Sequence, residues 1–365
     1  MSLLKSINLI LRASRLQSIN QIKFEGFRGL YSATSLGLDG FIQQQERVRN
    51  QLANIQDKFK AKMKENVQED SKNIVFTEDL KNMIHIASNE DVDIVVKMMK
   101  KFNKQNKELR FGNFIFGSVA MRMFYVLNKP NEALECFKSP DLEGFFDQLI
   151  SYQLLCDLLY ENQKYSEILD CFNFIKNKQV EGSKYPRNIV VIAFAACYRM
   201  NTEESLNYAM NLWKELMDVD HIPARRAVTF FAGLLLKHDK ADVSLEVLSN
   251  VQNQNYTTIR NLKVLTLTKL NRLDDTIPIL KSILQVESVQ VQTFNKDVLD
   301  ILQEQLAKQN NTELLNYSLE QQLLSEINTR TWKPNKTQNR FQSNRTFKSR
   351  PNLQRNERVA LRDME

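Results

Sequence analysis

The chain has 365 residues, of which 42% are hydrophobic and 25% are charged, so most of it can bury a core. Its nine glycines and seven prolines are few, which argues against a sheet-rich fold with many tight turns and favours helices. Four cysteines without CxxC spacing and three histidines exclude a disulfide framework and give no zinc-ligand pattern, and no glycine-rich phosphate loop is present. No window of roughly 18 apolar residues exists, so we expect no stable membrane insertion. We also expect no metal, no cofactor and no enzymatic activity, with a carboxylate-based nuclease as the least favoured alternative.

Residues 1–35 have the composition of a mitochondrial transit peptide. Their apolar residues follow one face of a helix, at Leu3, Leu4, Ile7, Ile10 and Leu11. Lys5, Arg12 and Arg15 lie beside this face, and Glu25 is the single acid in the range. The potential across the inner mitochondrial membrane attracts such a cationic amphipathic helix. A secretory signal would need an apolar stretch that Arg12 and Arg15 interrupt, so we expect a location in the mitochondrial matrix, with an ordinary surface helix as the alternative.

Residues 36–75 are predicted to form a polar helical leader, and the body from 76 to 286 repeats a two-helix unit. The segment 132–137 matches 167–172 at four of six positions, 35 residues later. Polar loops separate the two helices of a unit, at 128–131, 161–164, 200–202 and 271–273. A helix pair of this length cannot bury its apolar face alone, so at least three units must stack.

This pattern predicts an all-α fold, a right-handed α-solenoid of five or six degenerate helix-turn-helix repeats. We expect aromatic residues to fill the layers between the helices, among them Phe137, Phe172 and Trp213. The cysteines stand in apolar helical segments, so we expect them to be buried as small hydrophobic residues.

The C-terminal part divides into predicted capping helices over 287–328 and a basic, disordered tail over 329–365. The tail carries ten basic and three acidic residues, and polar residues separate its aromatic ones, a composition that cannot form a core. Aromatic stacking on bases and contacts to phosphates would suit single-stranded RNA. The candidate RNA contacts of the tail are Trp332, Arg340, Phe341, Arg345 and Phe347. The alternative is a solubilising tail or a protein-docking arm.

Five segments resemble a known family in this order and spacing: FGNFIFG at 111–117, EGFF at 143–146, ISYQLLCDLL at 150–159, AFAACY at 193–198 and ARRA at 224–227. Over roughly 75–285 the chain resembles the pentatricopeptide repeat family, and its best single repeat is 150–184. The resemblance implies non-catalytic binding of mitochondrial RNA, a role in RNA maturation that supports the respiratory chain, and RNA-processing proteins as further partners. The repeat lengths are irregular and clean specificity pairs are missing, so we expect no readable base code.

In such repeats, side chains early on the first helix face the concave groove and read single bases. Counting fifteen residues back from each second-helix marker gives the candidate base-reading residues Ser118, Gln153, Val190, Thr229 and Asn261. Phosphate contacts need cations, and the candidates near first-helix starts are Arg187, Arg225, Arg226 and Arg260. Two alternatives stay open. The polar positions could mark only a solvated helix edge, and the groove could bind protein as a scaffold for respiratory-complex assembly.

Overall fold

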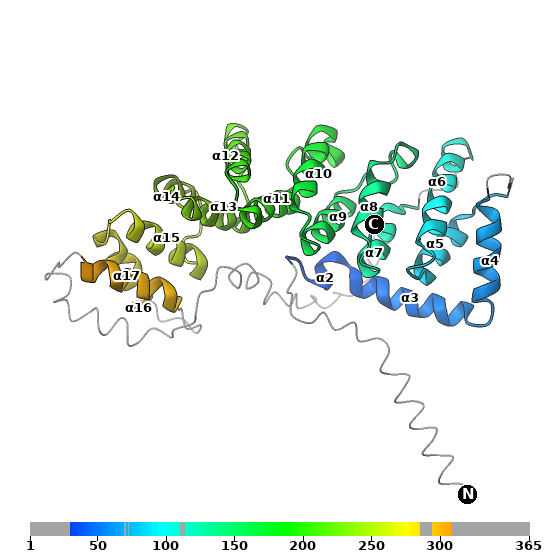
Figure 1. Cartoon of the computed structure of the whole chain (residues 1–365), viewed down its shortest axis with the longest axis horizontal. Coiled ribbons are helices and arrows are strands. Elements are labelled where there is room, and N and C mark those ends of the chain that lie inside the picture. The colour runs from blue at the N-terminus through cyan, green and yellow to red at the C-terminus, as the bar shows by residue number, and fades with distance from the viewer. Residues whose placement is uncertain (1–29, 69–70, 72, 110–113, 285–293, 309–365) are drawn as a thin grey trace, which may run out of the picture.

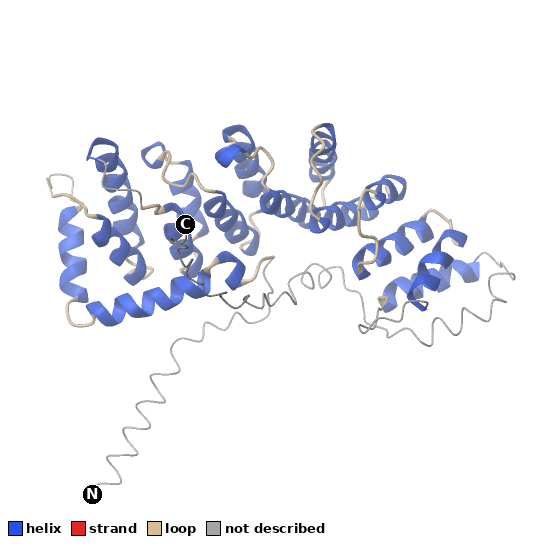
Figure 2. Ribbon diagram, turned by 180° about the vertical axis from the view of Figure 1, so that it is seen from behind, coloured by secondary structure: helices blue, strands red, loops and turns tan. Residues whose placement is uncertain are grey.

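The computed structural model describes residues 30–68, 71, 73–109, 114–284 and 294–308. Regular secondary structure within these ranges is helical, and the fold is the predicted solenoid of stacked helix pairs (Figure 1, Figure 2). Most of the predicted transit peptide, the basic tail with its five candidate contacts, and the predicted capping residues 309–328 lie outside the described residues.

Six consecutive helix pairs build the described part of the solenoid. The first helices are α5 (Thr77–Ile86), α7 (Gly117–Val126), α9 (Leu149–Glu161), α11 (Arg187–Met200), α13 (Arg225–Lys237) and α15 (Thr257–Lys269). The second helices are α6 (Val92–Leu109), α8 (Pro130–Lys138), α10 (Tyr165–Lys178), α12 (Glu203–Asp218), α14 (Ala241–Ser249) and α16 (Ile277–Leu284). Each first helix packs on the next one. The first helices form a layer on the inner side of an arch, and the second helices α6, α8, α10, α12 and α14 form its outer side (Figure 1).

Helices at both ends extend this arrangement. The N-terminal helices are α2 (Ala33–Leu36), α3 (Leu38–Leu52) and α4 (Gln56–Asn66), and α17 (Lys296–Lys308) packs on α15 at the other end. Helix α3 crosses α5 and α7 on the inner side of the arch (Figure 1). Its Leu38, Phe41 and Val48 are buried, so α3 is a packed part of the arch although most of its residues are polar.

The same kind of turn joins the two helices in five of the described pairs. One residue in each turn has a positive φ between 52° and 61°, namely Asn128, Gln163, Asn201, Asp239 and Asn271. Asn and Asp adopt this left-handed conformation more readily than other non-glycine residues, and it ends a helix. In four of the turns the following N–H returns to a carbonyl five residues earlier, with an N···O distance of 2.9 Å. The four polar loops predicted from the sequence all fall at such turns.

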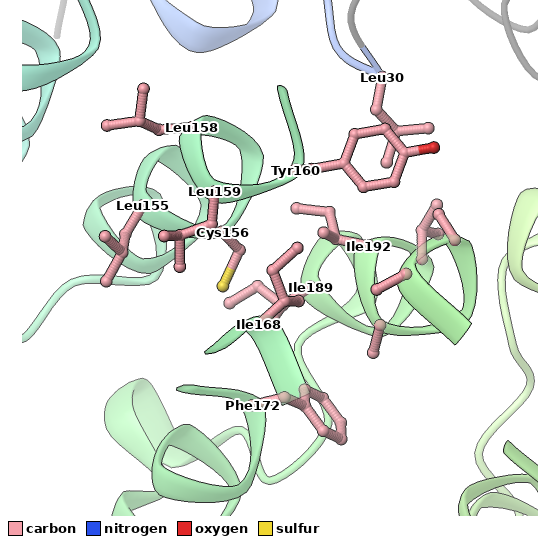
Figure 3. Packing of buried hydrophobic residues seen from close by; sticks show 14 of the residues in the cluster. Leu30, Leu155, Cys156, Leu158, Leu159, Tyr160, Ile168, Phe172, Ile189 and Ile192 are labelled. Atoms are coloured by element: carbon pink, nitrogen blue, oxygen red, sulfur yellow. The ribbon is translucent and has the colours of Figure 1, made fainter. Parts of the chain in front are cut away.

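Buried aromatic and aliphatic residues fill the space between the helices. Phe172 is fully buried and Phe137 is 9% exposed at the matching position of the preceding second helix, while Trp213 is partly buried with its ring 5.3 Å from that of Phe231. These three aromatic predictions are therefore confirmed. All four cysteines are free and buried, as predicted, and Figure 3 shows Cys156 among the aliphatic residues of three helices.

A close helix–loop contact makes Gly117 sensitive to substitution. A Cβ atom at this position would lie 2.6 Å from the carbonyl oxygen of Phe145 and 3.0 Å from the Cα of Phe146, both backbone atoms. We expect Gly117→Ala to lower the free energy of unfolding by about 1–3 kcal/mol, measured by urea denaturation. Gly40→Ala is the matched control, because Gly40 lies on the exposed side of α3 and nothing lies within 4 Å of its added Cβ. The control should gain about 0.5–1 kcal/mol, and equal effects of the two substitutions would contradict the steric argument.

Candidate nucleic-acid interface

The predicted phosphate-contacting arginines lie along one edge of the arch. Arg187 begins α11, and Arg225 and Arg226 begin α13. Arg260 lies in the first turn of α15. Successive first helices run in the same direction, so their N-terminal ends follow one another along this edge. We call it the first-helix edge: the residues just before and in the first turn of α5, α7, α9, α11, α13 and α15. Helix N-termini carry positive partial charge, which also favours anions there.

The arginines differ in how far solvent reaches them. Arg187 is exposed and Arg225 is half-buried, whereas Arg260 is only 5% exposed. Burial lowers the pKa of the Arg260 guanidinium, since the low-dielectric surroundings disfavour its charged form. Arg187 is therefore the best placed of the three for contact with a ligand from solvent.

Aromatic rings stand beside cations on the same edge. The guanidinium carbon of Arg225 lies 3.3 Å from the centroid of the Tyr256 ring, which precedes α15. The Nζ atom of Lys184 lies 5.3 Å from the centroid of the Tyr185 ring, which precedes α11. The side chain of Tyr256 keeps 41% of its surface exposed. A base could stack on the exposed Tyr256 ring while the adjacent cation contacts the backbone phosphate, whereas the Tyr185 ring is only 6% exposed.

A third pair lies further along the edge, before α7. The Nζ atom of Lys81 is 4.0 Å from the centroid of the Phe114 ring, and this ring is 43% exposed. Sequence reasoning missed these aromatic residues as site candidates. Their positions in the sequence could have indicated them as candidates. Phe76, Phe114 and Tyr256 each lie within three residues of the start of a first helix.

The candidate base-reading residues are mostly turned into the solenoid. Four are buried and one is half-buried: Gln153 at 7% exposure, Val190 at 1%, Thr229 at 6%, Asn261 at 2%, and the half-buried Ser118. Gln153 Oε1 accepts a hydrogen bond from Asn188 Nδ2 at 2.9 Å, and Asn261 Oδ1 accepts one from the Asn295 backbone N–H at 2.8 Å. The Gln153 amide thus connects α9 to α11, the Asn261 amide connects α15 to the residue before α17, and Thr229 donates to a carbonyl of its own helix. These hydrogen bonds engage the side chains of Gln153, Asn261 and Thr229 within the protein.

A short N-terminal segment occupies the inner face of the arch over α9, α11 and α13. We call residues 30–36 the strap. Arg226 Nη1 donates to the Leu30 carbonyl at 3.2 Å, and its guanidinium carbon lies 5.3 Å from the Tyr31 ring centroid. Tyr31 Oη donates to the Asn188 carbonyl at 2.9 Å. Arg226, predicted as a phosphate contact, therefore holds the protein's own backbone and ring.

The other end of the strap is fixed in the same way. Arg122 Nε donates to the Leu36 carbonyl at 2.9 Å, and Leu36 is only 1% exposed. Contacts of the strap thus reach Arg122 on α7, Asn188 on α11 and Arg226 on α13. On the first-helix edge, Lys184, Arg187 and Tyr256 are exposed to a ligand.

Two carboxyl groups lie under the strap on α9. Asp157 has no exposed surface, and Tyr125 Oη donates to its Oδ2 atom at 2.9 Å, while no hydrogen bond reaches its Oδ1 atom. Burial raises the pKa of Asp157 to about 8, and the negative charge of Glu161 adds to this rise. Burial also raises the pKa of Glu161 itself. Buried carboxyl groups offer a phosphate backbone no positive charge, which again favours the first-helix edge.

Metal-binding groups and reactive thiols are two features that the described residues allow to be checked. No three His, Cys, Asp or Glu side chains among them are placed to hold a metal ion. Burial raises the pKa of the Cys136 and Cys171 thiols to about 12, so neither is a ready nucleophile. None of the described helices combines the length and the apolar character that crossing a membrane requires.

Comparisons with known proteins give a consistent result. No protein-family model matches the chain. It is 30% identical over 237 residues to the Mus musculus protein named "Pentatricopeptide repeat-containing protein 2, mitochondrial", covering 64% of this chain and 61% of that protein. The Homo sapiens protein of the same name is 26% identical over 237 residues, with 64% and 60% covered.

The Pongo abelii protein of this name matches over the longer range of 283 residues at 25% identity, covering 76% of this chain and 73% of that protein. The matches to the mouse and human proteins span about three fifths of the length of those relatives. With its stacked helix pairs, the chain is thus a helical-repeat protein similar to these mitochondrial pentatricopeptide repeat-containing proteins.

Proposed function

We propose that the protein binds single-stranded RNA in the mitochondrial matrix without catalysing a reaction, and so takes part in the maturation of transcripts that support the respiratory chain. The observation that carries this proposal is the row of cation–aromatic pairs along the first-helix edge. Similarity to proteins named for pentatricopeptide repeats supports it, since repeats of this kind suit unpaired RNA.

The binding mode follows from which groups are accessible. Lys184 and Arg187 are exposed near the start of α11 and can contact phosphates, while the Tyr256 and Phe114 rings can stack on bases. Stacking tolerates any base because every base has a π-face. The amides of Gln153 and similar residues are engaged inside the solenoid, so we propose weak base preference. RNA-processing proteins would then supply the chemistry.

A mitochondrial location is part of the same proposal. The relatives from mouse and human are named mitochondrial. The basic residues and amphipathic pattern within 1–35 fit import driven by the membrane potential. Localisation of the full chain with a C-terminal fluorescent tag, with and without residues 1–29, tests this part separately from RNA binding.

A salt series of RNA binding tests the first-helix edge. We expect the double substitution Lys184→Gln and Arg187→Gln to weaken binding to a single-stranded RNA and to lower the salt slope by up to about one for each lost phosphate contact. Fluorescence anisotropy between about 50 and 200 mM salt measures both quantities. Arg226 is a poor choice for this test because it also holds Leu30.

The matched control removes the same charge from the outer layer. Lys138→Gln and Lys214→Gln alter exposed lysines of the second helices α8 and α12, and should leave affinity and salt slope unchanged. Equal losses for both double variants would indicate unspecific attraction by net charge. No measurable binding, or a flat salt slope of the unmodified chain, would reject RNA binding through phosphate contacts.

A protein-binding scaffold is the second candidate, and exposed apolar residues favour it. Ile222 and Ile115 on the first-helix edge are 66% and 57% exposed. Exposed apolar side chains that lie on one surface suit a protein-binding site. Crosslinking in isolated organelles separates the two functions. Protein adducts at this edge without RNA adducts would support the scaffold and contradict RNA binding.

A further inference from the structure

Leu30 is held in the arch by its side chain and by both of its backbone polar groups. The residue is 4% exposed, and Figure 3 shows its side chain next to the ring of Tyr160 at the end of α9. The Leu30 carbonyl accepts from Arg226 at 3.2 Å, and its backbone N–H donates to the Glu161 carboxylate. A cationic side chain therefore holds the Leu30 carbonyl, and an acidic side chain holds its backbone N–H.

Glu161 stands at the end of α9 beside the Leu30 nitrogen, with a second carboxyl group on the same helix. Glu161 is half-buried, and Asp157 one helical turn earlier is fully buried with no hydrogen bond to its Oδ1 atom. Arg226 and Arg199 supply the positive charge that the carboxyl groups feel. Burying a carboxylate is costly unless it is well paired, so another cation beside Glu161 would stabilise this cluster.

We propose that the mature chain begins at Leu30, and that the Glu161 carboxylate forms the binding site for its α-ammonium group. The proposal rests on the mitochondrial import proposed above. An organellar endopeptidase would hydrolyse the Gly29–Leu30 peptide bond with one water molecule, leaving a carboxylate on Gly29 and an amine on Leu30. At neutral pH the amine takes up a proton, so an amide N–H becomes a charged group with three donors at the same place.

The geometry argues for this bond over cleavage further along the chain. Cleavage after Leu30 would remove its buried side chain and the carbonyl that Arg226 holds, and cleavage after Tyr31 would also remove the ring beside Arg226. Cleavage well before Leu30 would leave a neutral amide at the Glu161 carboxylate. Only a chain that starts at Leu30 keeps every strap contact and adds the missing charge.

The first test identifies the N-terminus of the protein as it occurs in mitochondria. The full chain with a C-terminal tag is isolated from organelles, and its intact mass and N-terminal peptide are determined by mass spectrometry. We expect Leu30 as the first residue of the major species. A major species that begins at any other residue, or retains residues 1–29, would overturn the proposal, whereas RNA binding by that species would leave the proposed function intact.

The second test examines the site without relying on import. Two purified chains start at Leu30, one with a free α-amine and one with the amine acetylated. We expect the pKa of the free amine to lie above its usual value of about 7.7–8.0, because the Glu161 carboxylate favours the charged form of the amine. An NMR titration measures this pKa. Acetylation should lower the melting temperature at pH 7 by about 2–4 °C or more. Equal melting temperatures together with an ordinary amine pKa would refute the site.

Substitutions assign the effect to the proposed carboxylate. Glu161→Gln should bring the amine pKa back to its usual range and should remove most of the difference between the free and acetylated chains. Glu135→Gln on α8 is the matched control at an exposed glutamate, and should change neither quantity. If Glu161→Gln leaves the amine pKa raised, Glu161 is not the partner. The acetylated chain keeps the proposal testable should this variant fold poorly.

Discussion

Phe194→Ala is expected to lower the free energy of unfolding by about 3–5 kcal/mol, the range found when a buried phenylalanine is truncated in a core. Phe194 lies on α11 and has no exposed surface. Its ring centroid is 5.3 Å from that of Phe231 on α13 and 6.3 Å from that of Trp213 on α12. The three rings join two neighbouring repeats, so the cavity would weaken the interface between them as well as one helix pair.

Urea denaturation followed by circular dichroism measures this change. Repeats contact only their neighbours, so a weakened interface between α11 and α13 should also broaden the transition or divide it in two. Phe76→Ala is the matched control, because this phenylalanine is 58% exposed, and it should cost less than about 0.5 kcal/mol. Similar losses for the two variants would show that the ring cluster does not hold the repeats together.

The helix pairs could be predicted from the sequence because the signals for them are local. The loop at 128–131 contains Asn128 and Pro130, which end one helix and start the next, and the structure has a left-handed turn and the start of α8 there. The identity between 132–137 and 167–172 reflects buried positions that recur in α8 and α10, such as Phe137 and Phe172. Periodicity and turn chemistry thus sufficed for the fold.

The accessible groups of the candidate site could not be predicted in the same way. Gln153 and Asn261 are polar residues on apolar helices, which fits either a base contact or an internal hydrogen bond. The outcome depends on a partner further along the chain, Asn188 on α11 for Gln153 and Asn295 just before α17 for Asn261. A single sequence does not show which residue of a neighbouring helix stands opposite.

The contacts of the strap could not be predicted from the sequence for a different reason. Its contacts join residues far apart in the chain, with separations of 157 residues for Tyr31 and Asn188 and 196 for Leu30 and Arg226. No periodic pattern reports such a pairing. The predicted transit peptide also extended to residue 35, so its limit ran through a segment that the structure packs into the arch.

Asp157→Asn should make the protein more stable at neutral pH, by up to about 4 kcal/mol. Burial raises the pKa of this carboxyl from 3.8 to about 8, with Glu161 adding to the rise and with the Tyr125 hydroxyl and Arg226 opposing it. Tyr31, which lies over α9, feels the same carboxyl. The folded chain therefore keeps the proton up to about pH 8, whereas the unfolded chain loses it near pH 4. Between these values folding must take up a proton.

The direction of the pH dependence follows from this difference. Because the folded state binds more protons, stability falls as pH rises from about 4 to 8, by up to about 1.4 kcal/mol per pH unit from this group, and then levels off. Asparagine carries no proton to lose and still offers an oxygen to the Tyr125 hydroxyl, so its stability curve should be flatter over that range. Urea titrations of the full chain at pH 5, 6, 7 and 8 measure the curves.

Asp170→Asn, at an exposed position on α10, provides the matched control and should leave the curve of the unmodified chain unchanged. In a chain that starts at Leu30 with a free amine, the added positive charge would lower the pKa of Asp157, so the benefit of Asp157→Asn should shrink relative to the full chain. A benefit of the same size in both chains would place the amine too far away to act on this carboxyl. An Asp157→Asn variant that is less stable at pH 7 would show that Asp157 is ionised and paired in the fold, contrary to its buried setting.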